Sequence, residues 1–237
     1  ELKLGCLSWS ESMMQWIKEG LEAKGYKVEI VMFDANQLPA MALKDGSIDG
    51  IIANHKPWVD TFNKKNNCDI QMVKPYHFYS FFAIYSSKHK KLSDLPQNAQ
   101  ITIPSDPTNL SRSLIILKEA GLITLGEKKG VFYTIIDIKN NPKNIKFIEA
   151  EITQTSRSLP DVDAVIATAY YIKEAAKADP KVFLFEDPQN RDFPLGLIVR
   201  GADVESPWAK EAINILRSEK NRARFNERYN GIYTLIN

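Results

Sequence analysis

The chain has 237 residues, of which 44% are hydrophobic and 25% charged, and 31 basic residues against 29 acidic ones leave a net charge of +2. This composition is typical of a globular protein with one large or two small domains. The balanced charge, without long basic blocks interleaved with aromatic residues, argues against a nucleic-acid partner. The short basic cluster at residues 88–91 is expected to be a solvated loop.

No apolar run approaches the ~20 residues that are needed to cross a bilayer. The chain starts at Glu1 rather than at Met, so we expect that a secretory signal has been removed. The cysteines leave two alternatives open: Cys6 is a small buried residue of the first strand, or Cys6 and Cys68 form a disulfide in an oxidising compartment. Two cysteines and three histidines without ligand-like spacing predict no metal site, and we expect no cofactor.

Strand and helix patterns alternate along the chain. The main predicted strands are residues 2–7, 27–33, 49–53, 70–73, 76–85, 100–103 and 195–200. Helices are predicted up to residue 24, at 38–44, from near Pro57, around 114–117, at 169–177 and at 207–229. At the start of the first helix, Ser8 and Glu11 have the spacing of a capping box.

This alternation implies an α/β fold with parallel-rich sheets flanked by helices. The aromatic segment 76–85 is unusually long for one strand, and we expect it to pass between two lobes. The strand at 195–200 is expected to pass back to the first lobe. The two crossings predict a discontinuous first lobe, residues 1–82 plus 199–237, and a continuous second lobe, residues 83–198.

The segment 104–112, Pro-Ser-Asp-Pro-Thr-Asn-Leu-Ser-Arg, is the strongest candidate for a binding site. It lies between a short strand and an apolar helical run, so the amide groups of the first helical turn and the helix dipole favour an anion. Arg112 could add a two-pronged contact to a carboxylate. Asn109 is either a helix cap or a ligand contact. The segment therefore predicts a site for a small anionic or zwitterionic molecule.

Other polar segments also follow predicted strands, at residues 8–10, 54–58 and 167–170. In α/β sheets, ligands bind beyond the carboxyl ends of the strands, so these segments are expected to line the same kind of site. They include His55, which is either a satisfied structural histidine or a ligand contact.

Two stretches of the chain resemble signature motifs of the NlpA-type lipoproteins, the substrate-binding proteins of methionine ABC importers. They are residues 49–58, Asp-Gly-Ile-Ile-Ala-Asn-His-Lys-Pro-Trp, and residues 104–112. Shorter matches are Asn141-Pro142-Lys143-Asn144, Gln154 with Arg157, and residues 161–166. The matches follow the family's order over nearly the whole chain.

The resemblance implies a two-lobed periplasmic-binding-protein fold of the type II kind, with a small zwitterionic ligand clamped between the lobes. It implies an ABC permease as partner, a monomer, and an extracytoplasmic position in which a lipid anchor is the only attachment to the membrane. The expected mechanism is a hinge closure on the ligand.

The same resemblance implies which residues contact the ligand. The family's carboxylate-binding arginine falls on Arg112, and a neighbouring polar contact falls on Asn109. His55 falls on the histidine of the His-Lys-Pro motif. Aromatic positions that wall the side-chain pocket fall on Trp58 and Phe78.

The chain departs from the family at Ala167-Thr168-Ala169, where methionine-binding members carry an asparagine-rich stretch that contacts the ligand's α-amino and carboxylate groups. Alanine cannot accept a hydrogen bond from an ammonium, and an unpaired buried polar group costs about 1–3 kcal/mol. Tyr170 could place its hydroxyl there instead. A second departure is Ser80, where a tyrosine is usual. These departures argue against free methionine and favour a dipeptide or another small acid without a free α-amine at that position. The resemblance itself implies methionine or a related small amino acid.

The sequence thus predicts a binding protein rather than an enzyme. An enzyme on this fold would need a nucleophile or an acid–base pair, and Cys6, Ser8, Ser10 and His55 are the only candidates. No Gly-x-Ser-x-Gly or His-Glu-x-x-His motif is present. A surface adhesin or ligand-sensing lipoprotein that has kept the fold is the other alternative.

Overall fold

The computed structural model describes all 237 residues, and the chain divides into two compact units. Unit 1 comprises Glu1–Ser80 and Arg191–Asn237, and unit 2 comprises Phe81–Asn190. The lobe boundaries expected from the sequence, after residues 82 and 198, lie inside strands β6 (Phe82–Tyr85) and β14 (Ile198–Arg200).

Unit 1 is built around a five-stranded sheet with the order β2-β1-β3-β14-β4. Its other strands are β1 (Leu2–Cys6), β2 (Val28–Met32), β3 (Gly50–Ile52) and β4 (Ile70–Met72). Strands β1, β2 and β3 run parallel, whereas β14 is antiparallel to both of its neighbours. The carboxyl ends of β1, β2 and β3 therefore share one edge of the sheet.

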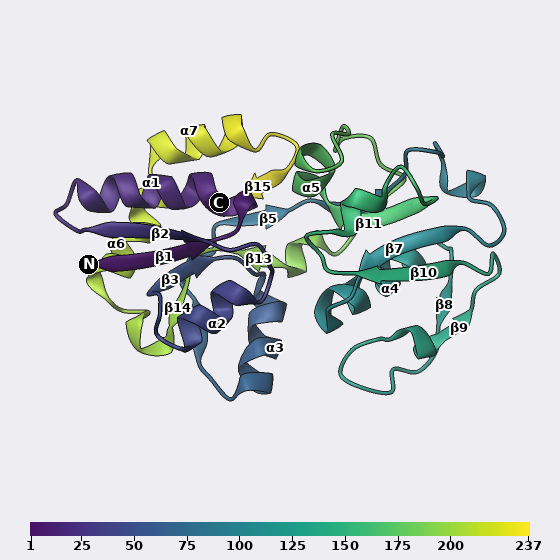
Figure 1. Ribbon diagram of the computed structural model, residues 1–237, viewed down its shortest axis with the longest axis horizontal. Helices are drawn as coiled ribbons and strands as arrows, with labels where there is room; N and C mark the ends of the chain where they lie inside the picture. The colour runs from purple at the N-terminus through teal and green to yellow at the C-terminus, as the bar shows by residue number, and fades with distance from the viewer. The chain divides into compact units, whose positions relative to one another are not determined.

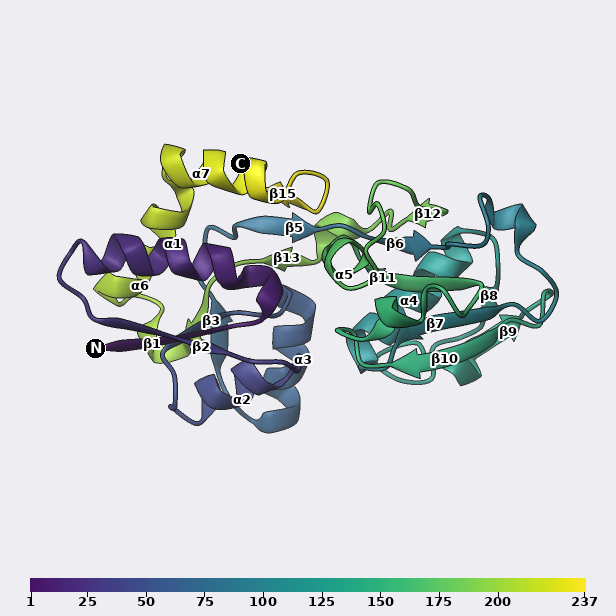
Figure 2. The same ribbon diagram turned by 45° about the horizontal axis from the view of Figure 1, so that its top comes forward.

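Helices cover both faces of this sheet (Figures 1 and 2). The helices of unit 1 are α1 (Glu11–Glu22), α2 (Leu38–Lys44), α3 (Lys56–Asn66), α6 (Pro207–Arg217) and α7 (Glu219–Arg228). Helix α1 packs against β1 and β2 with α6 beside it, and α2 packs against β3, β14 and β4. A second, small sheet has the order β13-β5-β15, with β13 (Pro194–Leu195), β5 (Phe78–Ser80) and β15 (Tyr233–Leu235).

Unit 2 contains a mixed sheet with the order β10-β7-β11-β6-β12. Its strands are β7 (Gln100–Pro104), β10 (Lys146–Ala150), β11 (Ala164–Thr168), β6 and β12 (Phe185–Glu186), and a separate pair is formed by β8 (Thr124–Leu125) and β9 (Ile138–Asn140). The helices are α4 (Pro107–Glu119) and α5 (Ala169–Glu174). Because β10, β7 and β11 are parallel and β6 is antiparallel to β11, the carboxyl ends of the first three lie at the edge where β6 begins.

Both faces of the central strands β6 and β11 are buried, which explains why these two strands are almost continuously apolar. One face packs against α4 through Ile101, Ile103, Leu114, Leu117 and Ile166. The opposite face carries Ala83, Val165 and Ala167, which pack with Ile172 of α5. The predicted α/β class with helix-flanked sheets is confirmed, although each main sheet includes antiparallel strands.

Three local expectations are corrected by the structure. The segment 76–85 is not one strand: β5 ends at Ser80 and β6 begins at Phe82 in the other unit. The capping box is wrong, because Ser8 lies in a short 3-10 turn and α1 starts at Glu11 without a side-chain cap. The disulfide alternative is excluded in this structure, since Cys6 and Cys68 are both free and Cys6 is buried. The longest helix, α4, has 13 residues, fewer than a membrane-spanning helix needs.

Candidate functional site

The first turn of α4 is closed by an acidic side chain. Asp106 is the N-cap and accepts a hydrogen bond from the backbone N–H of Asn109 at 3.2 Å. It also accepts from Thr108 Oγ1 at 2.9 Å and from the amide nitrogen of Asn109 at 3.0 Å. The negative charge favoured by this helix terminus is thus supplied by the protein itself. The cap is Asp106 rather than Asn109, and Asn109 is bound to that cap.

Arg112 lies one turn further along α4 and is buried. Its Nε donates to Asp187 Oδ2 at 2.6 Å, and an Nη donates to Asn190 Oδ1 at 2.9 Å. The guanidinium carbon lies 4.4 Å from the ring centroid of Phe82. Only 5% of the arginine side chain and 1% of the aspartate side chain are exposed, so this ion pair is shielded from water. Two separate segments of unit 2, the start of β6 and residues 187–190, therefore fix the guanidinium at the edge where β6 begins.

The backbone holds Asp187 in place for this contact. The N–H of Asp187 donates to the carbonyl of Phe82 at 2.9 Å, which continues the pairing of β12 with β6. Asp187 Oδ1 accepts from the N–H of Gln189 at 2.8 Å, while Oδ2 faces Arg112. Both carboxylate oxygens are thus engaged, as a buried charge requires.

His55 and Trp58 form the beginning of α3 in unit 1. His55 is the N-cap, and its Nδ1 accepts a hydrogen bond from the N–H of Trp58 at 3.1 Å. An accepting Nδ1 places the proton of a neutral imidazole on Nε2, so the ring presents a donor at that atom. The ring also meets Phe193 edge to face at 5.0 Å, and Trp58 stacks on Phe62 at 5.2 Å. Capping α3 through Nδ1 does not exclude a contact between His55 and a ligand.

The other two aromatic candidates differ in position. Phe78 is fully buried in an aromatic core of unit 1, with ring centroids 4.9 Å from Tyr233 and 5.6 Å from Phe225. Phe78 therefore packs in this core, and a contact between Phe78 and a ligand stays a prediction. Tyr170 lies in the first turn of α5, next to the carboxyl end of β11, and packs edge to face on Tyr171 at 5.3 Å.

The structure brings further polar groups to these strand ends that sequence reasoning did not single out. Asp187 and Asn190 are 75 and 78 residues from Arg112, a separation at which no local pattern indicates a contact. In unit 1, Asn54 follows β3, and its side-chain nitrogen donates to the carbonyl of Asn36 at 2.9 Å. The sequence places Asn54 in the polar segment 54–58 after a predicted strand, but nothing distinguishes it from its neighbours there.

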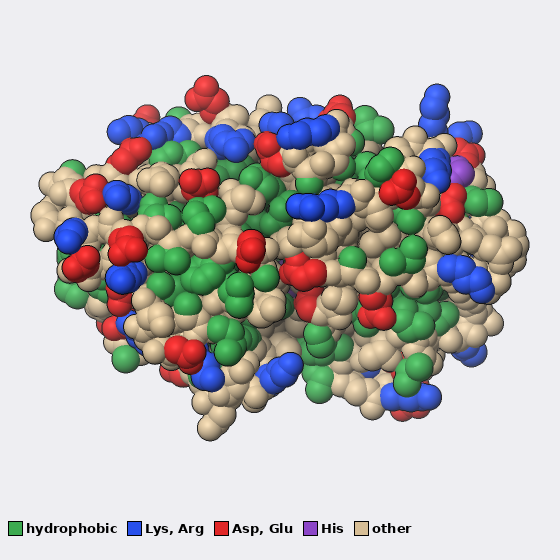
Figure 3. All heavy atoms as spheres, in the orientation of Figure 1, with side chains coloured by type: hydrophobic (Ala, Val, Ile, Leu, Met, Phe, Trp, Pro, Cys, Tyr) green, Lys and Arg blue, Asp and Glu red, His purple; other side chains and the backbone are tan.

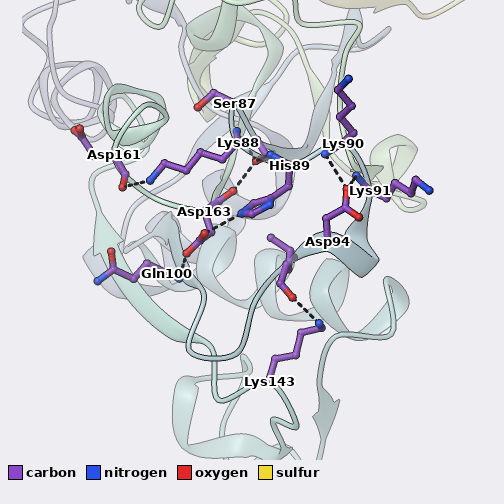
Figure 4. A network of polar contacts seen from close by, with 12 residues as sticks. Ser87, Lys88, His89, Lys90, Lys91, Asp94, Gln100, Lys143, Asp161 and Asp163 are labelled. Carbon is purple, nitrogen blue, oxygen red and sulfur yellow. Dashed lines mark hydrogen bonds and ion pairs between the residues drawn. The ribbon is translucent and has the colours of Figure 1, made fainter.

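Charged side chains of both signs are interspersed over the face shown in Figure 3, which agrees with the small net charge. The basic loop is anchored by its own contacts (Figure 4): His89 Nε2 lies 2.9 Å from Asp163 Oδ1, and Lys88 Nζ donates to the carbonyl of Asp161 at 2.7 Å. Ser87 and Lys90 have the Ser-x-x-Lys spacing of some hydrolases, but Ser87 Oγ donates to the carbonyl of Leu159 at 2.9 Å. This loop therefore offers no activated nucleophile.

The comparison with known proteins decides the family, since residues 2–235 match the NlpA lipoproteins. This chain belongs to the NlpA lipoprotein family. It is 30% identical over 234 residues to the D-methionine-binding lipoprotein MetQ of Escherichia coli O157:H7, covering 97% of this chain and 86% of that protein. The resemblance noted in the sequence is thereby confirmed.

Solved structures of similar proteins extend this result to the fold. A nutrient-binding protein from Burkholderia cenocepacia bound to methionine matches with a TM-score of 0.91 at 28% identity, covering 99% of both chains. The substrate-binding protein of a methionine transporter from Streptococcus pneumoniae matches with a TM-score of 0.90 at 28% identity, covering 99% of this chain and 95% of that one. The family points to a binding protein rather than an enzyme.

Proposed function

We propose that this protein is the extracytoplasmic substrate-binding component of an ABC importer and that its ligand is methionine or a closely related amino acid. The observation that carries the proposal is the match, over 99% of both chains, to a nutrient-binding protein that holds methionine. The family description as a lipoprotein supports attachment to the membrane through a lipid. An ABC permease is the proposed partner, and the protein is proposed to act as a monomer.

In unit 2, we propose that Arg112 binds the ligand carboxylate. A guanidinium can donate through several N–H groups, and burial strengthens a charge-assisted hydrogen bond. Asp187 and Asn190 hold the group in one orientation, so little side-chain entropy is lost when a ligand binds. Asn109 and Tyr170, at neighbouring strand ends, are the further proposed contacts of this unit.

In unit 1, we propose that His55 donates from Nε2 to an oxygen of the ligand and that Trp58 covers its apolar part. The N–H of Trp58 and the ring of Phe193 orient the His55 ring, so the direction in which Nε2 donates is fixed before a ligand binds. Trp58 is 9% exposed and supplies a large apolar surface.

Mass spectrometry under native conditions, followed by calorimetry on ligand-free protein, tests the proposal. We expect the purified protein to carry an amino acid and, after removal of that ligand by unfolding and refolding, to bind L- or D-methionine. L-Glutamate, which has the same backbone groups but a charged side chain, is the matched control and should bind far more weakly. Refolded protein that binds none of the common amino acids would exclude the proposed function.

A further inference from the structure

Unit 1 contains a buried hydrogen-bond acceptor that the protein leaves unused. Asn54 is 3% exposed, and its side-chain oxygen Oδ1 has no hydrogen-bond partner within the protein. Buried amide oxygens nearly always accept a hydrogen bond, because an unpaired one has lost its hydrogen bonds to water and gained none in the protein. An unpaired acceptor at this place therefore calls for an explanation in terms of a donor that binds there.

The orientation of the Asn54 amide is fixed by its own contacts. The side-chain nitrogen donates both to the backbone carbonyl of Asn36 at 2.9 Å and to the side-chain oxygen of Asn36 at 3.2 Å. Turning the amide over would set its oxygen against the carbonyl oxygen of Asn36. Oδ1 is consequently held on the side that faces away from Asn36.

The position of Asn54 is where this fold places ligands. It follows β3, whose carboxyl end lies beside those of the parallel strands β1 and β2, and it directly precedes His55. The neighbouring polar atoms already have protein partners: Ser10 Oγ donates to the carbonyl of Ile52 at 2.5 Å, and His55 Nδ1 accepts from Trp58. Neither of these atoms is the donor that Asn54 requires.

We infer that Asn54 Oδ1 accepts a hydrogen bond from the ammonium group of the bound ligand. The inference rests on the proposed function and specifies its ligand as one that carries a free amine. Unit 2 offers little for an ammonium at the end of β11, because Ala167 and Ala169 are fully buried and have no side-chain acceptor. A zwitterion needs an acceptor for its ammonium as well as a donor for its carboxylate, and Asn54 Oδ1 is an unused buried acceptor of unit 1.

Calorimetry with two probes tests this role. L-Methionine and 4-(methylsulfanyl)butanoate differ only in the α-ammonium, so the ratio of their affinities isolates the amine contact. We expect the wild-type protein to prefer methionine by about tenfold or more, and Asn54→Ala to reduce that ratio by about tenfold. The ratio, unlike methionine affinity alone, does not respond to a general loss of stability.

Asn63→Ala is the matched control in the same unit. The amide of Asn63 bonds both backbone groups of Ile70, so the variant also loses amide hydrogen bonds but should keep the wild-type ratio. Asn54→Asp loses the amide donor to Asn36, which lowers stability, but it retains an acceptor oxygen and adds a negative charge. Its ratio should therefore stay at or above the wild-type value even if Asn54→Ala does not fold.

The outcomes separate this inference from the proposed function. Wild-type protein that binds methionine, together with an unchanged ratio in Asn54→Ala or a lowered ratio in Asn54→Asp, would overturn the role of Asn54 alone. Wild-type protein that binds neither probe would overturn the proposed ligand class and this inference with it.

Discussion

Two buried basic side chains, Arg112 in unit 2 and His77 in unit 1, are accommodated in opposite ways. Arg112 keeps its charge because Asp187 and Asn190 pair with it. His77 is 1% exposed in an aromatic cluster, and neither of its ring nitrogens has a hydrogen-bond partner. Burial, followed by the charges of two arginines nearby, lowers the pKa of His77 from 6.5 to about 3. The comparison shows that a buried charge is retained where partners are provided and is lost where they are not.

The largest effect is expected when the partner of Arg112 is removed. Asp187→Ala leaves the guanidinium buried without its counter-charge, and breaking a buried ion pair in this way costs about 3–5 kcal/mol. We therefore expect the free energy of unfolding to fall by that amount in chemical denaturation.

Glu186→Ala is the control for this prediction, because Glu186 is the exposed neighbour of Asp187 and should change stability by less than about 0.5 kcal/mol. Equal losses in the two variants would show that the ion pair contributes no special stability.

The second effect concerns His77 and depends on pH. In the folded protein the imidazole stays neutral down to pH about 3, whereas in the unfolded chain it takes up a proton below pH about 6.5. The contribution of neutral His77 to the free energy of unfolding is therefore fully present above pH about 6.5. It falls as the pH decreases, by about 1.4 kcal/mol per pH unit, which amounts to about 3 kcal/mol at pH 4.

His77→Leu removes this contribution. We expect urea midpoints of the variant to depend less on pH between 7 and 4 than those of the wild type, with the two curves diverging only below pH about 6.5. Parallel curves would mean that His77 does not stay neutral in the folded protein.

The smallest effect is expected at an exposed pair of the same chemistry. Arg224 Nη1 donates to Glu19 Oε2 at 2.8 Å, but 35% and 53% of the two side chains are exposed. The hydrogen bond from Arg224 lowers the pKa of Glu19, yet solvent screens the interaction. Glu19→Ala should cost about 0.2–1 kcal/mol and less in high salt. A loss as large as that of Asp187→Ala, measured by the same denaturation, would contradict the role given to burial.

Much of the fold could be predicted from the sequence, because alternating strand and helix patterns depend on local periodicity. The exception is the segment 76–85, in which the aromatic pattern continues past the break at Phe81 and contains neither glycine nor proline. Which unit each half joins depends on pairing with β15 and β11, both of them distant in sequence.

The site was predictable only in part. The polar turn before α4 and the burial of Arg112 agree with the local pattern, but Asp106 and Asn109 are both good capping residues and only the backbone geometry selects Asp106. Asp187 could not be found, since its pairing with Arg112 depends on how β12 returns to β6. For Phe78 the sequence cannot distinguish two roles, because the pattern of an aromatic residue in a strand is the same whether the residue packs in a core or against a ligand.

Arg112 is proposed to bind the carboxylate of the ligand, and calorimetry with L-methionine and L-methioninol tests this most directly. Methioninol keeps the amine and the side chain but lacks the carboxylate. We expect the wild-type protein to prefer methionine by about a hundredfold. Arg112→Lys, which keeps a positive charge beside Asp187 but loses the guanidinium fork, should reduce that preference by about tenfold. Equal affinity of the wild-type protein for the two compounds would contradict the central claim.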